Sequence, residues 1–253
     1  MSRILVLNPN SSTDMTHGVE VAIRGLPGTL TTSTAPSGPA SINDAADLAA
    51  STEAVLSSLD IGSLTTQYDA VLVACYSVHP LVPKLSELMQ GKILVTGIFE
   101  ASILTALTLL PAYYSSSETV PSTWGVVTTG TFWEEHLSAG VTKFLGASAS
   151  GSDKNKFAGV YSTGLTAGDF HGGVTQETIT SRLKDATKAL LRSSPVGCVV
   201  MGCAGMAGLE EIIRSAAVEE YGAERGAQVY IIDGVKAGVG LLDQAAKQAA
   251  LFR

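Results

Sequence analysis

The chain is poor in charge and in long apolar runs, and each shortage excludes a class of protein. Charged residues make up only 15% of the 253 residues, and no cluster of Lys or Arg appears, so the basic stripe of a nucleic-acid-binding surface is missing. No apolar run approaches the roughly 20 residues that span a bilayer. The segment 3–7 (RILVL) predicts a strand and lacks the features of a signal peptide. We therefore expect a cytoplasmic protein without nucleic-acid or membrane partners.

Only three cysteines are present, at positions 75, 198 and 203. An odd number without a CxxC pair argues against a disulfide framework and against a zinc site. No grouping of His, Asp and Glu has metal-ligand spacing, and the glycines form neither GxGxxG nor a P-loop. We expect no metal and no cofactor, so the cysteines are either core residues or the source of the chemistry.

Apolar residues, by contrast, are abundant and make up 45% of the chain. The length of the chain allows one large domain or two lobes. Short β-branched runs alternate with helical periodicity, which indicates parallel α/β architecture. The predicted strands are Ile4–Leu7, Thr29–Thr34, Asp69–Ala74, Ile93–Gly97, Trp124–Thr128, Lys156–Tyr161, Val196–Met201 and Val229–Ile232. The predicted helices are Thr13–Arg24, Asn43–Leu59, Pro80–Met89, Glu100–Leu110, Phe132–Leu145, Val174–Arg192, Met206–Tyr221 and Val235–Ala250.

A Ser- and Pro-rich segment, 112–122, predicts a loop between two halves with the same order of elements. The third strand of each half ends in a cysteine, Cys75 or Cys203, followed by a helix. Ligands of parallel sheets bind beyond the carboxyl ends of the strands. Two halves related by an approximate two-fold axis would bring both thiols to one cleft.

Each thiol on its own has a plain alternative, because free cysteine is often a small buried hydrophobe. Cys203 follows an apolar strand and precedes a helix, where the helix dipole favours a thiolate. Cys75 has the same position in the first half, and the match makes the pair more persuasive than either thiol alone. Cys198 lies at the start of its strand, and we expect it in the core.

Small polar residues end the first strand of each half. Asn10 and Ser11 precede one helix, and Thr128 and Thr129 precede the other, where they suit a carboxylate or a polarised carbonyl. Helix capping explains part of each cluster as well. His79 could steady a thiolate or bind a substrate, or it could be an internal polar cap.

Several segments together resemble the aspartate/glutamate/hydantoin racemase superfamily, and within it the hydantoin/allantoin racemase branch. The segments are 4–12 (ILVLNPNSS) with 15–16, 38–42 (GPASI), 74–75 (AC), 97–101 (GIFEA), 126–129 (VVTT) and 202–206 (GCAGM). They occur in the expected order over nearly the whole chain. The combination of the opening NPNSS with the late GCAGM is specific to the family.

The resemblance implies two Rossmann-like α/β/α lobes with parallel sheets and an active site between them. It also implies that the last strand and helix return to the first lobe, so that the lobes are 1–97 with 222–253, and 98–221. Cys75 and Cys203 match the catalytic positions, where one thiolate removes a proton and the other thiol delivers one to the opposite face. The expected substrate-binding residues are Asn10, Ser11, Ser41, Ile42, Tyr76, Ser77, His79, Thr128, Thr129, Gly202, Ala204 and Gly205.

The turn after Cys75 departs from the family pattern. It reads Tyr76-Ser77-Val78-His79-Pro80, where bacterial hydantoin racemases typically have an aromatic residue, Gly and Asp, and segment 151–173 is hard to align. The expected substrate is a small molecule, a 5-substituted hydantoin such as allantoin. An aspartate- or glutamate-type amino acid, a maleate-like diacid isomerised through a covalent cysteine adduct, and a catalytically silent binding protein are the alternatives. The family also leads us to expect a homo-oligomer.

Overall fold

The computed structural model describes residues 1–112, 121–146 and 156–252. The chain divides into two compact units, Met1–Ala101 with Gly234–Arg253, and Ser102–Asp233. Most of the predicted loop 112–122, and part of the segment 151–173, lie outside the described residues. Among the described residues, no helix combines the length and the apolar character needed to cross a membrane.

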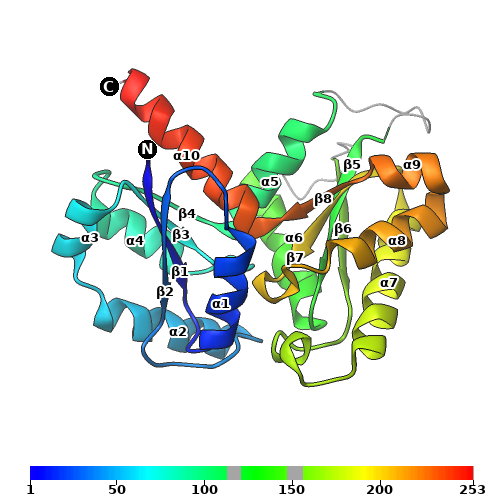
Figure 1. The fold of residues 1–253 in the computed structure, drawn as a ribbon, viewed down its shortest axis with the longest axis horizontal. Helices are drawn as coiled ribbons and strands as arrows, with labels where there is room; N and C mark the ends of the chain where they lie inside the picture. The colour runs from blue at the N-terminus through cyan, green and yellow to red at the C-terminus, as the bar shows by residue number, and fades with distance from the viewer. Residues whose placement is uncertain (113–120, 147–155, 253) are drawn as a thin grey trace. The chain divides into compact units, whose positions relative to one another are not determined.

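The first unit is built on a parallel sheet of four strands in the order β2-β1-β3-β4 (Figure 1). The strands are β1 (Arg3–Asn8), β2 (Thr29–Thr34), β3 (Ala70–Val73) and β4 (Leu94–Gly97). The helices are α1 (Thr13–Ala22), α2 (Ala45–Ser58), α3 (Ile61–Gln67), α4 (Leu81–Met89), the start of α5 (Ile98–Leu109) and α10 (Gly234–Phe252). β3 is buried along its whole length, as expected for a strand covered on both faces.

The second unit repeats this topology, with strands in the order β6-β5-β7-β8. They are β5 (Thr123–Thr128), β6 (Phe157–Ser162), β7 (Val196–Gly202) and β8 (Tyr230–Asp233), all parallel. The unit also contains α6 (Phe132–Leu145), α7 (Gln176–Ser193), α8 (Glu210–Tyr221), α9 (Ala223–Gln228) and two 3₁₀ turns, Gly168–His171 and Ala204–Met206. Its core packs α7 and α8 against β5 and β7.

The shared strand order puts a topological switch point between the first and third strands of each unit. β1 pairs with β3, and β5 pairs with β7. In open parallel sheets, ligands bind outside the carboxyl ends of the strands at such a switch point. The residues after β1 and β3, and those after β5 and β7, are therefore the ones that the fold presents to a ligand.

The structure confirms the α/β class and all eight strands, but it corrects the division of the chain. The segment 222–253 was expected in the first lobe. Only α10 is there, in contact with β4, β3 and β1, whereas β8 pairs with β7 in the second sheet. β8 belongs to the second sheet because its residues pair in register with β7, where Ile232 lies opposite the buried Val200 and is itself buried.

Three helical details also differ from the sequence prediction. The helix predicted over 206–221 begins only at Glu210, because a 3₁₀ turn and Gly208, with φ of 88°, interrupt the chain first. The short helices α3 and α9 were not predicted. Each has only six or seven residues, which is too short for a clear 3.6-residue pattern.

Candidate active site

Cys203 is the first residue after β7, and its side chain is partly exposed. The backbone N–H of Gly205 points at its Sγ, 3.3 Å away. Burial raises the pKa of the Cys203 thiol to about 11, against the N–H groups of Gly205 and Met206, which lower it. The thiol is therefore protonated at neutral pH, and the two N–H groups are placed to stabilise a thiolate when one forms.

The strand end before Cys203 depends on a close approach between β5 and β7. A Cβ on Gly202 would lie 2.6 Å from Cγ1 of Val126 and 2.9 Å from Cβ of Thr128, so a larger residue does not fit there. The Thr128 hydroxyl donates to the Gly202 carbonyl at 2.8 Å and is fully buried. Thr129 is also buried, and its carbonyl accepts from the N–H of Gly164 at 3.0 Å. Both threonines, predicted as ligands of a substrate, hold the strand end in the structure.

Cys75 follows β3 by two residues, and its thiol is partly exposed. The hydroxyl of Ser77 donates to Cys75 Sγ at 3.4 Å, and the Ser77 N–H donates to the Cys75 carbonyl at 3.0 Å. Tyr76 turns inward and packs edge-on against Phe99, with 5.6 Å between ring centroids. The structure thus gives Cys75 a hydroxyl donor and places the Tyr76 ring in the core.

His79 is only 2% exposed and makes two internal hydrogen bonds. Its Nδ1 accepts from the N–H of Leu81 at 3.2 Å, so the proton of the neutral ring lies on Nε2, 3.0 Å from the hydroxyl of Ser51. Burial lowers the pKa of His79 to about 4. Of the two sequence hypotheses, the geometry favours the internal cap of α4.

Asn10 belongs to a buried network at the end of β1. Its Oδ1 accepts from Asn8 Nδ2 and from the Ser12 N–H, both at 2.9 Å, and Asn8 Nδ2 also donates to Thr16 Oγ1 at 3.0 Å. Within the described residues, the one acceptor near Asn10 Nδ2 is the sulfur of Met15, 3.1 Å away, which is a weak acceptor. Asn10 therefore keeps donor capacity at the switch point, and Asn8 and Thr16 hold it in place.

Three further residues that were predicted to bind substrate, Ser11, Ser41 and Ile42, make contacts within the protein. Ser11 Oγ donates to the carbonyl of Gly38 at 3.0 Å, and Ser41 Oγ donates to Asn43 Oδ1 at 3.1 Å. Ile42 is 5% exposed. These contacts tie segment 38–43 to the end of β1 and shape the crevice edge.

Glu100, in the first turn of α5, is a residue that the sequence analysis did not select. A Cβ on Gly97 would lie 2.5 Å from Glu100 Oε2, so the glycine at the end of β4 makes room for the carboxyl group. Burial raises the pKa of Glu100, against the N–H groups of Glu100 and Gly97, which lower it. Its Oε2 is buried and has no hydrogen-bond partner among the residues that the structure describes. The signal in the sequence was a glycine at a strand end followed three residues later by an acid.

The third cysteine lies in the core, as predicted. Cys198 is fully buried within β7, and burial raises its pKa to about 12. It provides a chemically matched control for the other two thiols.

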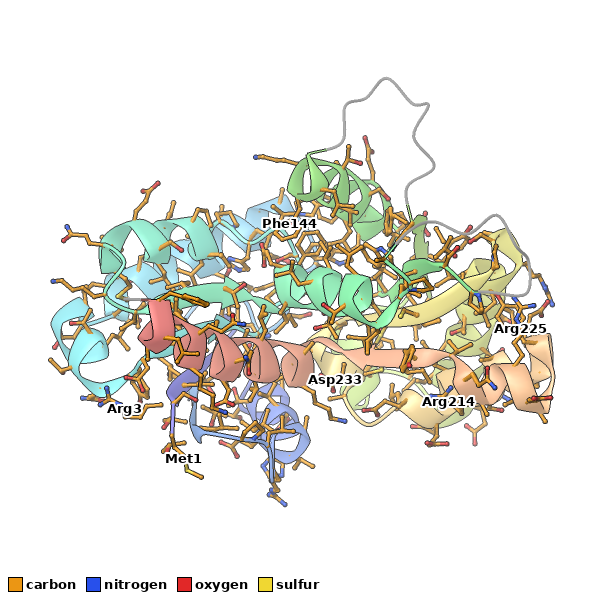
Figure 2. All side chains as sticks on the ribbon, turned by 90° about the horizontal axis from the view of Figure 1, so that it is seen from above. Met1, Arg3, Phe144, Arg214, Arg225 and Asp233 are labelled. Carbon is orange, nitrogen blue, oxygen red and sulfur yellow. The ribbon has the colours of Figure 1, made fainter. Side chains whose placement is uncertain are left out.

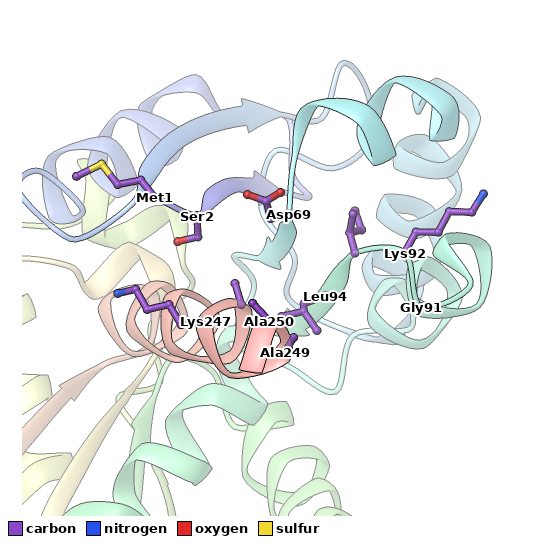
Figure 3. Close-up of a pocket in the computed structure, with 11 residues that line it drawn as sticks. Met1, Ser2, Asp69, Gly91, Lys92, Leu94, Lys247, Ala249 and Ala250 are labelled. Atoms are coloured by element: carbon purple, nitrogen blue, oxygen red, sulfur yellow. The ribbon is translucent and has the colours of Figure 1, made fainter. Parts of the chain in front are cut away.

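The predicted residues follow the carboxyl ends of the strands, whereas a cavity of the first unit lies at the amino ends. That cavity, of about 450 Å³, is lined by residues at the amino ends of β1, β3 and β4 and by the end of α10, among them Ser2, Asp69, Leu94 and Lys247 (Figure 3). Cys75 and Asn10 instead follow β3 and β1, at the carboxyl edge of this sheet. Cys203 has the equivalent place in the second unit.

Comparison with known proteins places the chain in a family. The model of the Asp/Glu/Hydantoin racemase family matches residues 4–242. An uncharacterized protein of Schizosaccharomyces pombe is 32% identical over 246 residues, which is 96% of this chain and 91% of that protein. The hydantoin racemase of Paenarthrobacter aurescens is 28% identical over 209 residues, 81% of this chain and 79% of that enzyme.

A solved structure has the same fold. The allantoin racemase from Klebsiella pneumoniae superimposes with a TM-score of 0.75 at 22% identity, covering 98% of this chain and 89% of that one. Together with the family match over almost the whole length, this confirms the resemblance seen in the sequence. The chain belongs to the Asp/Glu/Hydantoin racemase family, and it is an isomerase of the racemase class.

Proposed function

We propose that the protein is a cofactor-independent racemase of a 5-substituted hydantoin, with allantoin as the first candidate, and that Cys75 and Cys203 exchange protons with one carbon. The observation that carries the proposal is the matched position of the two thiols. Each is partly exposed, follows the third strand of its sheet, and has a donor on its sulfur: the Ser77 hydroxyl in one unit and the Gly205 N–H in the other.

Two thiols suit this reaction because racemisation in one direction is the mirror image of the other. One thiolate removes the C5 proton while the opposite thiol delivers its own, and the roles reverse for the other enantiomer. Burial raises the pKa of Cys203, which favours its thiol form and suits it to deliver a proton when Cys75 is the base. In the other direction, the N–H groups of Gly205 and Met206 stabilise its thiolate.

The carbanion at C5 delocalises onto the neighbouring ring carbonyl, whose oxygen then needs hydrogen-bond donors. Asn10 is suited to this task, because its carboxamide N–H groups face only a thioether. A ring with its own N–H and carbonyl groups also complements the backbone amides and hydroxyls at these strand ends. Relatives called hydantoin racemase and allantoin racemase support this choice of substrate.

The test is proton exchange and loss of optical rotation, measured together. Single enantiomers of allantoin and of 5-benzylhydantoin are incubated with the protein in deuterated buffer, and proton NMR follows the C5 hydrogen while polarimetry follows rotation. We expect both signals to run faster than in the no-enzyme control. Cys75→Ser and Cys203→Ser should each lower the racemisation rate by at least about 10²-fold, the lower end of what a general acid or base contributes.

Cys198→Ala is the matched control, because it removes a thiol that lies in the core, and it should keep most of the activity. Wild-type signals at the background rate would contradict the hydantoin assignment and direct the same assay to aspartate, glutamate and maleate. Full activity in either serine variant would contradict the two-thiol mechanism.

A further inference from the structure

A cavity in the second unit lies at the edge of the sheet opposite Cys203. It has a volume of about 620 Å³ and is lined by Pro121 before β5, Gly197 at the start of β7 and Tyr230 at the start of β8. These residues mark the amino ends of the strands, whereas Cys203 follows the carboxyl end of β7. The cavity is therefore separate from the proposed catalytic residues, and what it binds is a question of its own.

Two guanidinium groups line this cavity, and neighbouring groups hold both in place. Arg214 of α8 donates from Nη1 to the carbonyls of Gly226 and Ala227, at 3.0 and 3.1 Å, and to that of Val229. Arg225 of α9 lies over the ring of Tyr221, 4.1 Å from its centroid. Both arginines come from neighbouring helices at one end of the second unit (Figure 2). Their positive charges are thus fixed before any ligand arrives.

Neither guanidinium has a carboxylate partner within the part of the chain that the structure describes. Among the described residues the buried Nε–H of Arg225 has no acceptor, so this guanidinium has hydrogen-bonding capacity that the protein does not use. The cavity of the first unit differs in this respect. There, Asp69 pairs with Arg3 at 2.7 Å and Asp243 pairs with Lys247 at 2.5 Å. Asp69 and Lys247 of that cavity are thus paired with opposite charges, unlike the two arginines of the second cavity.

Apart from Gln228, the other side chains that line the cavity are apolar or aromatic. They include Leu109, Leu110, Pro111, Pro121 and Tyr230. We propose that this cavity is a binding site for a small organic carboxylate, whose oxygens accept from the guanidinium of Arg225 and whose apolar body contacts the leucine and proline side chains. The planar guanidinium matches a carboxylate with two parallel hydrogen bonds, and the volume suits a molecule of metabolite size.

The experiment is a calorimetric titration of the full-length protein with benzoate, with acetate and inorganic phosphate as comparison anions. Benzoate should bind saturably at one site, and acetate and phosphate at least about tenfold more weakly, because neither fills the apolar wall. Arg225→Gln should weaken benzoate binding at least about tenfold, since a paired charge and two hydrogen bonds are lost. Arg225→Lys keeps the charge without the planar fork, so its affinity should lie between the two.

Arg182→Gln is the matched control, because it removes an exposed arginine of the same unit, and it should bind benzoate like the wild type. Circular dichroism checks the fold of each variant, and the lysine variant gives a second reading if the glutamine variant is unfolded. The proposal is overturned if wild type gives no saturable heat, if the folded Arg225 variants bind as tightly as wild type, or if phosphate or acetate binds as tightly as benzoate. Weakened binding in Cys203→Ser would also overturn it, because that result would place the ligand at the opposite edge.

Discussion

At the scale of single residues, His79 is a buried polar side chain held by internal hydrogen bonds. Its two ring nitrogens bond to Ser51 and to the N–H of Leu81, and burial lowers its pKa to about 4. In the unfolded chain a histidine titrates near 6.5. Between pH 6.5 and 4 the histidine is therefore protonated in the unfolded state but neutral in the folded state. Because protonation favours the unfolded state, the protein loses stability as the pH falls through this range.

We expect the wild type to lose about 2 kcal/mol of unfolding free energy between pH 7 and pH 5 through this group. His79→Gln should be less stable at pH 7 but should show a correspondingly smaller loss on acidification. Urea denaturation at the two pH values measures both quantities. His17→Gln, at an exposed position, should keep the wild-type dependence. Equal acid losses in wild type and His79→Gln would contradict the neutral, buried histidine.

Glu100 changes the stability in the opposite direction, because its contribution is lost as the pH rises. Burial raises the pKa of its carboxyl group, so the folded state holds a proton that the unfolded state has already released. This contribution to stability is present below pH 4.5 and is lost as the pH rises through the folded-state pKa. Glu100→Gln removes the titrating group and should flatten this part of the stability profile.

The measurement is thermal unfolding of the wild type and Glu100→Gln from pH 4.5 to pH 8. The difference in Tm should move in favour of the glutamine variant as the pH rises. Glu53→Gln, an exposed change in the same unit, should show no such trend. A constant difference across the range would mean that Glu100 titrates alike in the folded and unfolded chains.

At the scale of elements, the positions of the strands along the chain could be predicted from the sequence, whereas the local turn geometry could not. Runs such as Val71–Val73 and Val199–Met201 are apolar at every position, which is the pattern of a strand buried on both faces, so their strands and the thiols after them could be placed. The short helices α3 and α9 carry too few residues for a period to show. The membership of β8 depends on pairing with a strand that lies about 30 residues earlier, and no local pattern encodes it.

The candidate site shows the same limit. Cys75 and Cys203 were identifiable because each has a chemically distinctive side chain at a strand end. The supporting contacts could not be identified from the sequence, because Asn8 and Thr16 acquire their roles from the turn conformation. Glu100 acquires its place from the glycine before α5, which leaves room for its carboxyl group. Thr128 was placed correctly at a strand end, but its hydroxyl is used by the Gly202 carbonyl. Such assignments need the direction of each side chain, which spacing alone does not supply.

At the scale of the whole molecule, the chain enters the second unit within α5 and returns at Gly234, so the last helix completes the core of the first unit. Gly238 of α10 packs directly on β3, because a Cβ there would lie 2.4 Å from Leu72 Cδ1. Gly240, two residues on, has open space at the equivalent point. Both tryptophans, Trp124 and Trp133, belong to the second unit. These features allow the stability of each unit to be followed separately.

We expect Gly238→Val to destabilise the first unit by about 1–3 kcal/mol through overpacking against Leu72. Gly240→Ala should be neutral or stabilise α10 by up to about 1 kcal/mol, since alanine restricts the unfolded chain more than glycine does. Hydrogen exchange read by mass spectrometry should show faster exchange in β1, β3 and α10 of Gly238→Val, while the second unit and its tryptophan emission stay unchanged. Because each unit encloses a sheet and helices of its own, destabilisation confined to one of them is the expected result. Equal loss of protection in both would instead show that the two units unfold as one cooperative body.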